Sequence, residues 1–160
     1  KTVGTLPMAT WLSIPSIELN APITELETVW KDGEFVWERP IKSVGHHHGT
    51  PVPGEAGNVV MSGHRSSLIQ GEGSVFRQLD EISELLEKSK TTGQPIDILV
   101  YTPRTIYIYR TVSTRIVDPE ELSIFKQTTE PTLTLITCTP DLVYTHRFIV
   151  SALMIATVPL

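Results

Sequence analysis

The sequence predicts an all-β fold with short helices, closed or nearly closed into a barrel of about eight strands. Segments rich in β-branched and aromatic residues alternate between apolar and polar positions, which is the pattern of half-buried strands. Turn residues separate these segments at short intervals. With 160 residues, 40% of them hydrophobic, we expect one domain with a real core over residues 11–160, preceded by an irregular arm over residues 1–10.

The first third of the chain predicts two strands, a hairpin and a loop. In order, these elements span residues 11–19, 21–26, 30–37 and 45–57. Pro15 cannot donate a ladder hydrogen bond, so it confines the first strand to a sheet edge or a bulge. Asp32-Gly33 lies between apolar residues and is a hairpin-turn signal. The glycines and prolines crowded into the last of these segments indicate a loop.

The middle of the chain predicts a strand, a loop and a helix. They span residues 58–64, 66–74 and 75–83, and residues 84–90 either extend the helix or form a further helical turn. Ser74 is the expected N-cap, and Gly93 is expected to stop the helix. Val75, Leu79 and Ile82 recur at helical spacing and form an apolar stripe.

The last third predicts four strands and a short helix. The strands span residues 95–101, 105–116, 132–137 and 144–156. The helix opens after the second of them, with Asp118 as the cap and Pro119 at the first helical position. Pro140 cannot donate to a ladder, so the third strand should end near Cys138.

Cys138 is the only cysteine, so the chain can form no intramolecular disulfide. It lies at the end of an expected strand, where a thiol can meet a substrate. A thiol becomes an effective nucleophile when a base and a cation lie nearby. His64 and Arg147 are the candidates for these two groups. The alternative is that Cys138 is a small buried hydrophobe.

Arg147 and His64 would have definite roles beside Cys138. Antiparallel pairing of the Cys138 strand with the strand that follows puts Arg147 at the same end of the sheet, where its permanent charge stabilises a thiolate or an oxyanion. His64 would protonate a leaving amine and later deprotonate an incoming one. Taken singly, Arg147 can instead be an exposed strand residue and His64 a structural histidine.

Charge and hydropathy exclude other classes of protein. The net charge is -5 and no basic run is present, which argues against binding to nucleic acid or to an anionic membrane surface. The longest uncharged apolar run, residues 148–160, is shorter than the roughly 20 residues that span a bilayer. The sequence begins at Lys1 and shows no signal peptide, so we expect a fragment or a processed form, with any membrane attachment through an anchor outside it.

Taken together, these motifs resemble the sortase family, the cysteine transpeptidases of Gram-positive-type cell surfaces. The resemblance covers about residues 11–156 in unbroken order. The family's Thr-Leu-x-Thr-Cys motif is matched in full by Thr134-Leu135-Ile136-Thr137-Cys138. Other matches are the catalytic-histidine strand Gly57-Asn58-Val59-Val60-Met61-Ser62-Gly63-His64-Arg65, the arginine strand Arg147-Phe148-Ile149-Val150, the opening strands Leu12-x-Ile14-Pro15-x-Ile17 and Ala21-Pro22-Ile23, and the helix Val75-Phe76-Arg77-Gln78-Leu79.

The resemblance implies an eight-stranded sortase-type β-barrel, with residues 11–160 as the catalytic domain. It also implies a mechanism, in which Cys138 attacks the Thr carbonyl of a Leu-Pro-x-Thr-Gly-like sorting signal on a surface protein. His64 protonates the leaving amine, and Arg147 binds the oxyanion or positions the substrate. An amine from a cell-wall precursor or a pilin Lys then resolves the thioester. This chemistry implies no metal and no cofactor.

The resemblance also implies where the substrate binds. The groove for the signal should be walled by residues 117–131, in which Leu122, Ile124 and Phe125 are the apolar candidates. These three side chains can equally serve only to dock a short helix onto the barrel. Thr137 and Thr139 flank the thiol and can donate hydrogen bonds. The expected location is the extracellular face of the cell membrane.

Several alternatives stay open. The fold alone would also suit a catalytically silent barrel used for adhesion or assembly, and the site alone would suit a cysteine hydrolase. Residues 1–10 lack the Asp-Pro-aromatic lid motif of the pilus-building class C, so the sequence is closer to classes D, E or F. In an extended segment, His46 and His48 would face away from His47, which argues against one metal ion bound by all three.

Overall fold

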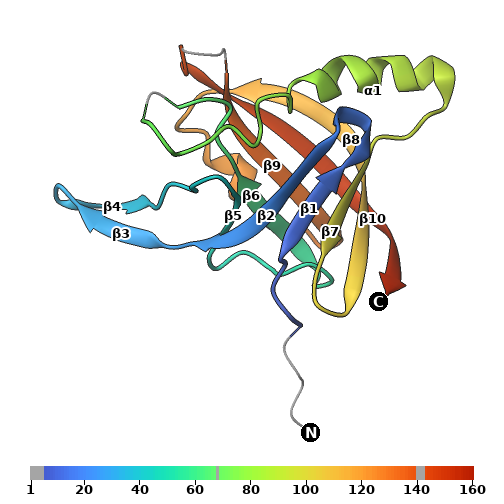
Figure 1. Cartoon of the computed structure of the whole chain (residues 1–160), viewed down its shortest axis with the longest axis horizontal. Helices are drawn as coiled ribbons and strands as arrows, with labels where there is room; N and C mark the ends of the chain where they lie inside the picture. Colours follow the sequence, from blue (N-terminus) through green and yellow to red (C-terminus); the bar gives the residue numbers. More distant parts are fainter. Residues whose placement is uncertain (1–5, 68, 140–142) are drawn as a thin grey trace, which may run out of the picture.

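The computed structural model describes residues 6–67, 69–139 and 143–160. Eight strands form a closed barrel with the order β1-β2-β5-β6-β9-β10-β8-β7, and β7 pairs with β1 to close it (Figure 1). The barrel strands are β1 (Trp11–Ile14), β2 (Leu19–Leu26), β5 (Val44–His47), β6 (Gly57–Ser62), β7 (Asp97–Tyr101), β8 (Thr105–Val117), β9 (Pro131–Thr139) and β10 (His146–Pro159). The predicted eight-stranded barrel is confirmed.

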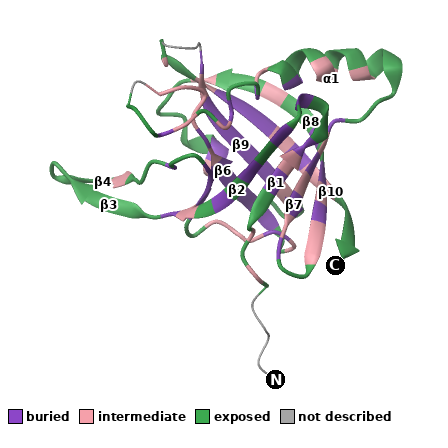
Figure 2. Ribbon diagram, in the orientation of Figure 1, coloured by how far each residue is buried: buried purple, intermediate pink, exposed green. Residues whose placement is uncertain are grey.

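The core fills the barrel, as the alternation in the sequence predicts. Tyr109, Leu12 and Met61 are fully buried inside it. Tyr107, Tyr109 and Thr111 share the buried face of β8, as expected. Figure 2 shows the buried residues gathered on the barrel strands and the β3–β4 hairpin largely exposed. A second, smaller cluster of Val60, Ile124, Ile136 and Ile149 makes β6, β9 and β10 apolar on both faces.

The pairing of β6, β9 and β10 determines where the ends of these strands meet. β6 and β9 are parallel, with Val60 beside Thr134 and Ser62 beside Ile136. β9 and β10 are antiparallel. The carboxyl ends of β6 and β9 and the start of β10 therefore lie at one rim of the barrel.

Two expectations for the first third of the chain are wrong. Strand β1 ends at Ile14, because Pro15 begins a 3₁₀ turn, η1 (Pro15–Ile17), where a missing N–H costs nothing. The strand is not an edge, since it pairs with both β2 and β7. The start of the expected loop at residues 45–57 is instead part of the buried strand β5, which ends at His47. Close packing accounts for the glycine in this strand, because a Cβ at Gly45 would come 2.3 Å from the Leu26 side chain.

The predicted helix at residues 75–83 is displaced. Helix α1 (Glu81–Thr92) begins at Glu81 and not after Ser74, and it ends at Gly93 as expected, with φ 74°. Residues 74–80 form tight turns, in which the N–H of Leu79 donates to the Phe76 carbonyl. Phe76, Leu79 and Ile82 are the buried side chains, and their three-residue spacing fits such turns better than an α-helix.

The short helix before the Cys138 strand starts later than predicted. It is the 3₁₀ helix η2 (Leu122–Phe125), and the cap is the Glu121 carboxylate, which accepts the N–H of Ser123 at 3.1 Å. Asp118 and Pro119 therefore do not open it. The expected hairpin is confirmed as β3 (Thr28–Lys31) and β4 (Glu34–Trp37), and it projects from the barrel (Figure 1). Within the described ranges, no helix has the length and apolarity to cross a bilayer.

Adjacent histidines of β5 have separate surroundings, as the alternation predicts. Nδ1 of His46 lies 2.7 Å from Glu25, and Nδ1 of His48 lies 3.2 Å from the same carboxylate. His47 has different partners. Its Nε2 lies 2.8 Å from the Ser62 hydroxyl, and its ring packs edge-on against Trp37.

We predict that His47 makes the stability of the fold depend on pH. Burial, reinforced by the charge of His46, lowers the pKa of His47 from 6.5 to about 4. The unfolded chain therefore binds more protons between these values, and the free energy of unfolding falls as pH falls through this window. The loss should reach about 2 kcal/mol near pH 4.5. His47→Phe should remove this part of the pH dependence, as measured by urea unfolding at pH 7 and pH 4.5.

The matched control is His146→Phe, because His146 is also a histidine but is exposed. It should retain the wild-type dependence on pH. Equal losses of stability in the wild type and in His47→Phe would contradict the prediction.

Candidate active site

Cys138 lies next to last in β9 and is partly buried. Along this strand Leu133 and Leu135 face the main core, whereas Ile136 belongs to the cluster outside the barrel. Because side chains alternate, Cys138 shares the outer face with Ile136. The thiol therefore faces a groove on the outside of the barrel rim.

Arg147 lies directly opposite Cys138 in the ladder between β9 and β10. Residues opposite each other in an antiparallel pair project from the same face of the sheet, so the guanidinium shares the face of the thiol. One guanidinium nitrogen donates to the backbone carbonyls of Tyr144 at 3.2 Å and His146 at 3.1 Å. These bonds hold a permanent positive charge beside Cys138.

His64 follows β6 by two residues, and the backbone on either side of it is fixed. The Gly63 N–H donates to the Ile136 carbonyl at 3.1 Å, and the Thr137 hydroxyl donates to the Gly63 carbonyl at 2.9 Å. The N–H of Phe76 donates to the His64 carbonyl at 2.9 Å. The imidazole is mostly buried, and its Nε2 lies 3.8 Å from a carboxylate oxygen of Glu72. The imidazole therefore has a defined position at the same rim.

Two hollows meet at these three side chains. The first, of about 510 Å³, is lined mostly by residues that carry a polar group, namely Arg39, Ser66, Ser67 and Tyr144, together with Ile69. The second, of about 290 Å³, has a largely apolar wall of Trp37, Pro40, His47, Ser62, Gly63, Pro119, Ile124, Phe125, Ile136 and Thr137. Cys138, His64 and Arg147 line both. The thiol thus lies between an apolar and a polar half of one groove.

The apolar half is built on three aromatic rings in mutual contact. Trp37 meets His47 edge-on with centroids 4.4 Å apart, and it stacks on Phe125 at 6.1 Å with an interplanar angle of 13°. His47 and Phe125 meet edge-on at 5.2 Å. These rings come from β4, from β5 and from the segment before β9, so the barrel rim and the η2 segment together form this wall.

The residues predicted to bind substrate have different places. Ile124 and Phe125 line the apolar hollow, and Leu122 is 76% exposed and outside that set. The hydroxyl of Thr137 is already engaged with Gly63. Thr139 is buried and does not line either hollow.

Sequence reasoning missed several residues that line the groove, among them Arg39 and the aromatic residues Trp37 and His47. It also missed Glu72, which does not line the groove but has a carboxylate oxygen 3.8 Å from Nε2 of His64. His47 was visible as the middle residue of the histidine triplet, on the opposite side from its neighbours. Trp37 ends the predicted hairpin, and Arg39 and Glu72 lie outside helices and strands. None of the three has a local sequence signal that places it at the rim.

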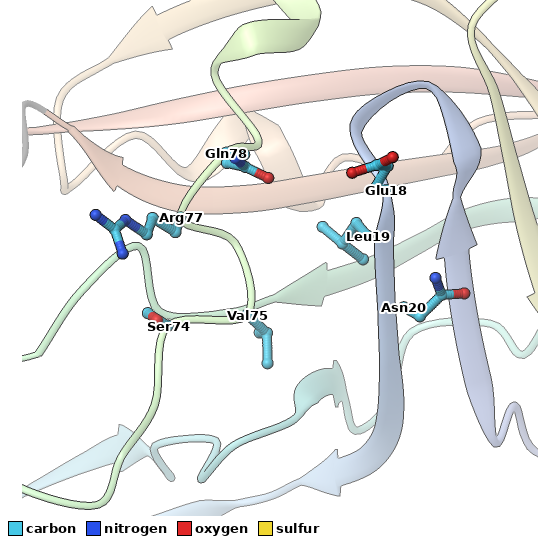
Figure 3. A pocket seen from close by; sticks show the side chains of 7 residues that line it. All are labelled: Glu18, Leu19, Asn20, Ser74, Val75, Arg77 and Gln78. Carbon is cyan, nitrogen blue, oxygen red and sulfur yellow. The ribbon is translucent and has the colours of Figure 1, made fainter.

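A separate hollow of about 340 Å³ lies between the β1–β2 turn and residues 74–78 (Figure 3). Glu18, Asn20 and Arg77 are among its lining residues, and none of the three candidate catalytic groups is. Within the described part of the chain, no group of three or more His, Cys, Asp or Glu side chains could hold a metal ion.

The arrangement at the rim can support acyl transfer. A thiol can act as the nucleophile, an imidazole can transfer protons, and a guanidinium can stabilise negative charge on sulfur or oxygen. Cys138 and Arg147 come from consecutive antiparallel strands, whereas His64 comes from a segment distant in sequence that reaches the rim because β6 pairs with β9.

Known proteins carry the same domain. The family model of the sortase domain matches residues 12–155. Sortase D of Bacillus subtilis (strain 168) is 35% identical over 130 residues, which are 81% of this chain and 53% of that protein. The chain therefore spans about half the length of this curated relative.

Solved structures share the fold. A sortase D5 transpeptidase from Clostridium perfringens is 25% identical with a TM-score of 0.67, over 96% of this chain and 83% of the other. Sortase C-3 from Streptococcus pneumoniae is 23% identical with a TM-score of 0.69, over 99% and 68%. Sortase E1 from Streptomyces coelicolor, solved with a tripeptide in the active site, is 22% identical with a TM-score of 0.69, over 96% and 90%. With a family model that matches nearly its whole length, the chain belongs to the sortase family.

Proposed function

We propose that the protein is a cysteine transpeptidase that cleaves a Leu-Pro-x-Thr-Gly-like sorting signal after Thr and transfers the acyl group to an amine. The observation that carries the proposal is the register of Cys138 opposite Arg147, with His64 at the same rim and all three lining one groove. Membership of the sortase family supports the same chemistry.

The first half of the reaction forms a thioester. The Cys138 thiol passes its proton to His64, and its sulfur attacks the Thr carbonyl carbon. The Arg147 guanidinium stabilises the negative charge that develops on the carbonyl oxygen. The Thr–Gly C–N bond then breaks, and His64 gives a proton to the departing Gly amine. The acyl chain remains on Cys138.

The second half releases the product. An amine from a cell-wall precursor or a pilin Lys loses a proton to His64 and attacks the thioester carbon. An amide bond forms, the carbon–sulfur bond breaks, and His64 returns the proton to sulfur, which regenerates the Cys138 thiol. Without an amine, water hydrolyses the thioester slowly.

The two halves of the groove suit the two sides of the cleaved bond. The Leu-Pro side chains fit the apolar half near Ile124 and Phe125, where burial of apolar surface favours them. The Gly side and the incoming amine fit the polar half near Ser66 and Ser67. In the cell, we place the protein at the extracellular face of the membrane.

The decisive experiment is a peptide panel that varies the second and fifth signal positions, read by mass spectrometry with and without an added Gly or Lys amine. A transpeptidase yields the amide of the added amine. Release of free acid alone would identify a cysteine hydrolase. A silent barrel would show no turnover, and its Cys138 would be protected from labelling by a methanethiosulfonate, a thiol-directed reagent.

We predict that the three rim residues differ in their effect on turnover. Cys138→Ala should abolish it, since no nucleophile remains, and His64→Ala should remove nearly all of it. Arg147→Ala should lower kcat/KM roughly 10²-fold, as for loss of an oxyanion donor. His146→Ala is the matched control because its side chain alternates to the opposite face of β10. Wild-type kinetics for Arg147→Ala would remove it from the site.

We predict that Phe125→Ala raises KM for a Leu-Pro signal about tenfold, because an aromatic wall of the apolar half is lost. The control is Leu122→Ala, which truncates an exposed side chain in the same 3₁₀ helix. Initial-rate kinetics give KM for both variants. Equal KM values for Phe125→Ala and Leu122→Ala would place the Leu-Pro pocket elsewhere.

A further inference from the structure

The β3–β4 hairpin carries a row of aromatic rings on one face. Trp30 lies opposite Phe35, and Trp37 lies opposite Thr28, so all of them project from the same side of the ribbon. Trp30 and Phe35 are 65% and 70% exposed, and their rings meet edge-on at 4.9 Å. We call Trp30, Phe35 and Trp37 the aromatic face.

The aromatic face is continuous with the groove. Trp37, at the base of the hairpin, stacks on Phe125 and meets His47, and these three rings line the apolar half next to Cys138. From there the face continues along the hairpin, which projects away from the barrel (Figure 1). The surface that begins beside the thiol therefore extends outward by about two strand residues, or roughly 7 Å.

The charges around the aromatic face help to identify its partner. Residues 27–39 contain four acidic and two basic side chains. Such a surface is repelled by anionic lipid, which attracts basic segments. Exposed aromatic rings that continue a peptide groove instead suit apolar side chains of a peptide chain.

We propose that the aromatic face binds apolar residues of the substrate protein that precede its sorting signal. The proposal rests on the proposed function, in which Leu and Pro of the signal occupy the apolar half. The residues that precede them then leave the groove away from Cys138 and past Trp37. The interaction lengthens the recognised segment beyond the signal itself.

The test measures affinity separately from turnover. Binding to the Cys138→Ala protein is measured by calorimetry for three peptides: the signal alone, the signal after four Leu- and Phe-rich residues, and the signal after four Gly and Ser residues. The apolar extension should lower Kd about tenfold, and the Gly-Ser extension should not. In the Cys138→Ala protein that also carries Trp30→Ala and Phe35→Ala, the apolar extension should no longer lower Kd. The matched control is Val29→Ala with Val36→Ala, a pair on the other face of the hairpin.

Three results would overturn the proposal. The first is an equal Kd for the two extended peptides. The second is an apolar extension that lowers Kd as much in the Trp30→Ala, Phe35→Ala variant as without these substitutions. The third is binding to phosphatidylcholine vesicles that this variant loses. Turnover of the signal by the wild type tests the proposed function separately, since the affinities do not depend on cleavage.

A second inference concerns Glu72, a buried carboxylate in the loop after His64. Gly71 and Gly73, on either side of it, have φ of 92° and 84°, in the left-handed region that favours glycine. The Lys42 N–H donates to the Glu72 carbonyl at 2.8 Å, and a Cβ on Gly73 would come 3.0 Å from Cα of Lys42. The loop backbone is thus arranged to hold Glu72 in place.

The Glu72 carboxylate is charged and close to the imidazole. It accepts the hydroxyl of Ser67, which is the main cause of its lowered pKa, and it pairs with Arg39 at 3.4 Å. Its other oxygen lies 3.8 Å from Nε2 of His64, and this nitrogen is buried with no hydrogen-bond partner among the described residues. At this distance the contact is electrostatic.

We infer that Glu72 is a positioning residue for His64. Its charge orients the imidazole and stabilises the imidazolium that forms when His64 takes a proton from the incoming amine. Glu72 does not line either half of the groove, so it acts through His64 and not on the substrate.

Glu72→Gln keeps the shape and removes the charge. We expect kcat to fall about tenfold with KM unchanged, because the interaction is made only as charge develops on His64. Glu72→Asp should recover part of the loss, and Glu55→Gln, at an exposed turn remote in sequence, should have no effect. Unchanged kcat in Glu72→Gln, or a loss that Glu72→Asp does not reduce, would overturn the inference. Thermal unfolding of each variant separates a folding defect from the kinetic effect.

Discussion

Strand β9 is the element on which the rest of the structure depends. It pairs in parallel with β6 and antiparallel with β10, and it is apolar on both faces because one packs into the barrel and the other under η2. A one-residue slip in either ladder would turn Cys138 to the opposite face and separate it from Arg147. Burial on both faces makes such a slip costly. The register of one strand thus maintains the geometry of the rim.

A buried polar network fixes the wall of the groove to the same strand. The Thr134 hydroxyl donates to Asn58 at 2.7 Å, and the Asn58 amide donates to the carbonyls of Ile124 at 2.9 Å and Lys126 at 3.3 Å. Buried polar groups are costly when unpaired, so the η2 segment is held in one position over β6 and β9. The apolar half of the groove is therefore attached to the ladder that carries the thiol.

The sequence predicts the elements whose signal is local. The strands of the second half, the Asp32-Gly33 hairpin and the end of α1 at Gly93 follow from alternation and turn chemistry. The pairing of Cys138 with Arg147 follows from a short connection between consecutive strands. The barrel, once the family resemblance is recognised, follows from motif order.

The remainder depends on contacts between distant segments. From the sequence, Gly45 is predicted to be a loop residue. Its place in a strand depends on Leu26, whose side chain fills the space that a Cβ at Gly45 would need. The place of Glu72 is set by a loop with two left-handed glycines, and no periodic pattern reports where such a loop points. Trp37 reads as the end of a hairpin, and only the stacking with Phe125 shows that it belongs to the groove.

The long interval between β6 and β9 has a consequence for how the protein is made. Gly63 and Thr137, which bond to each other at the rim, are 74 residues apart, and β1 must reach β7 before the barrel closes. Contacts across such intervals form late, because the loop must be closed before they can stabilise anything. A chain that emerges from the ribosome with its N-terminus first cannot assemble this rim until β10 has emerged, because Arg147 lies on that strand. Cys138, Arg147 and His64 therefore come together only after all the strands of the barrel have been synthesised.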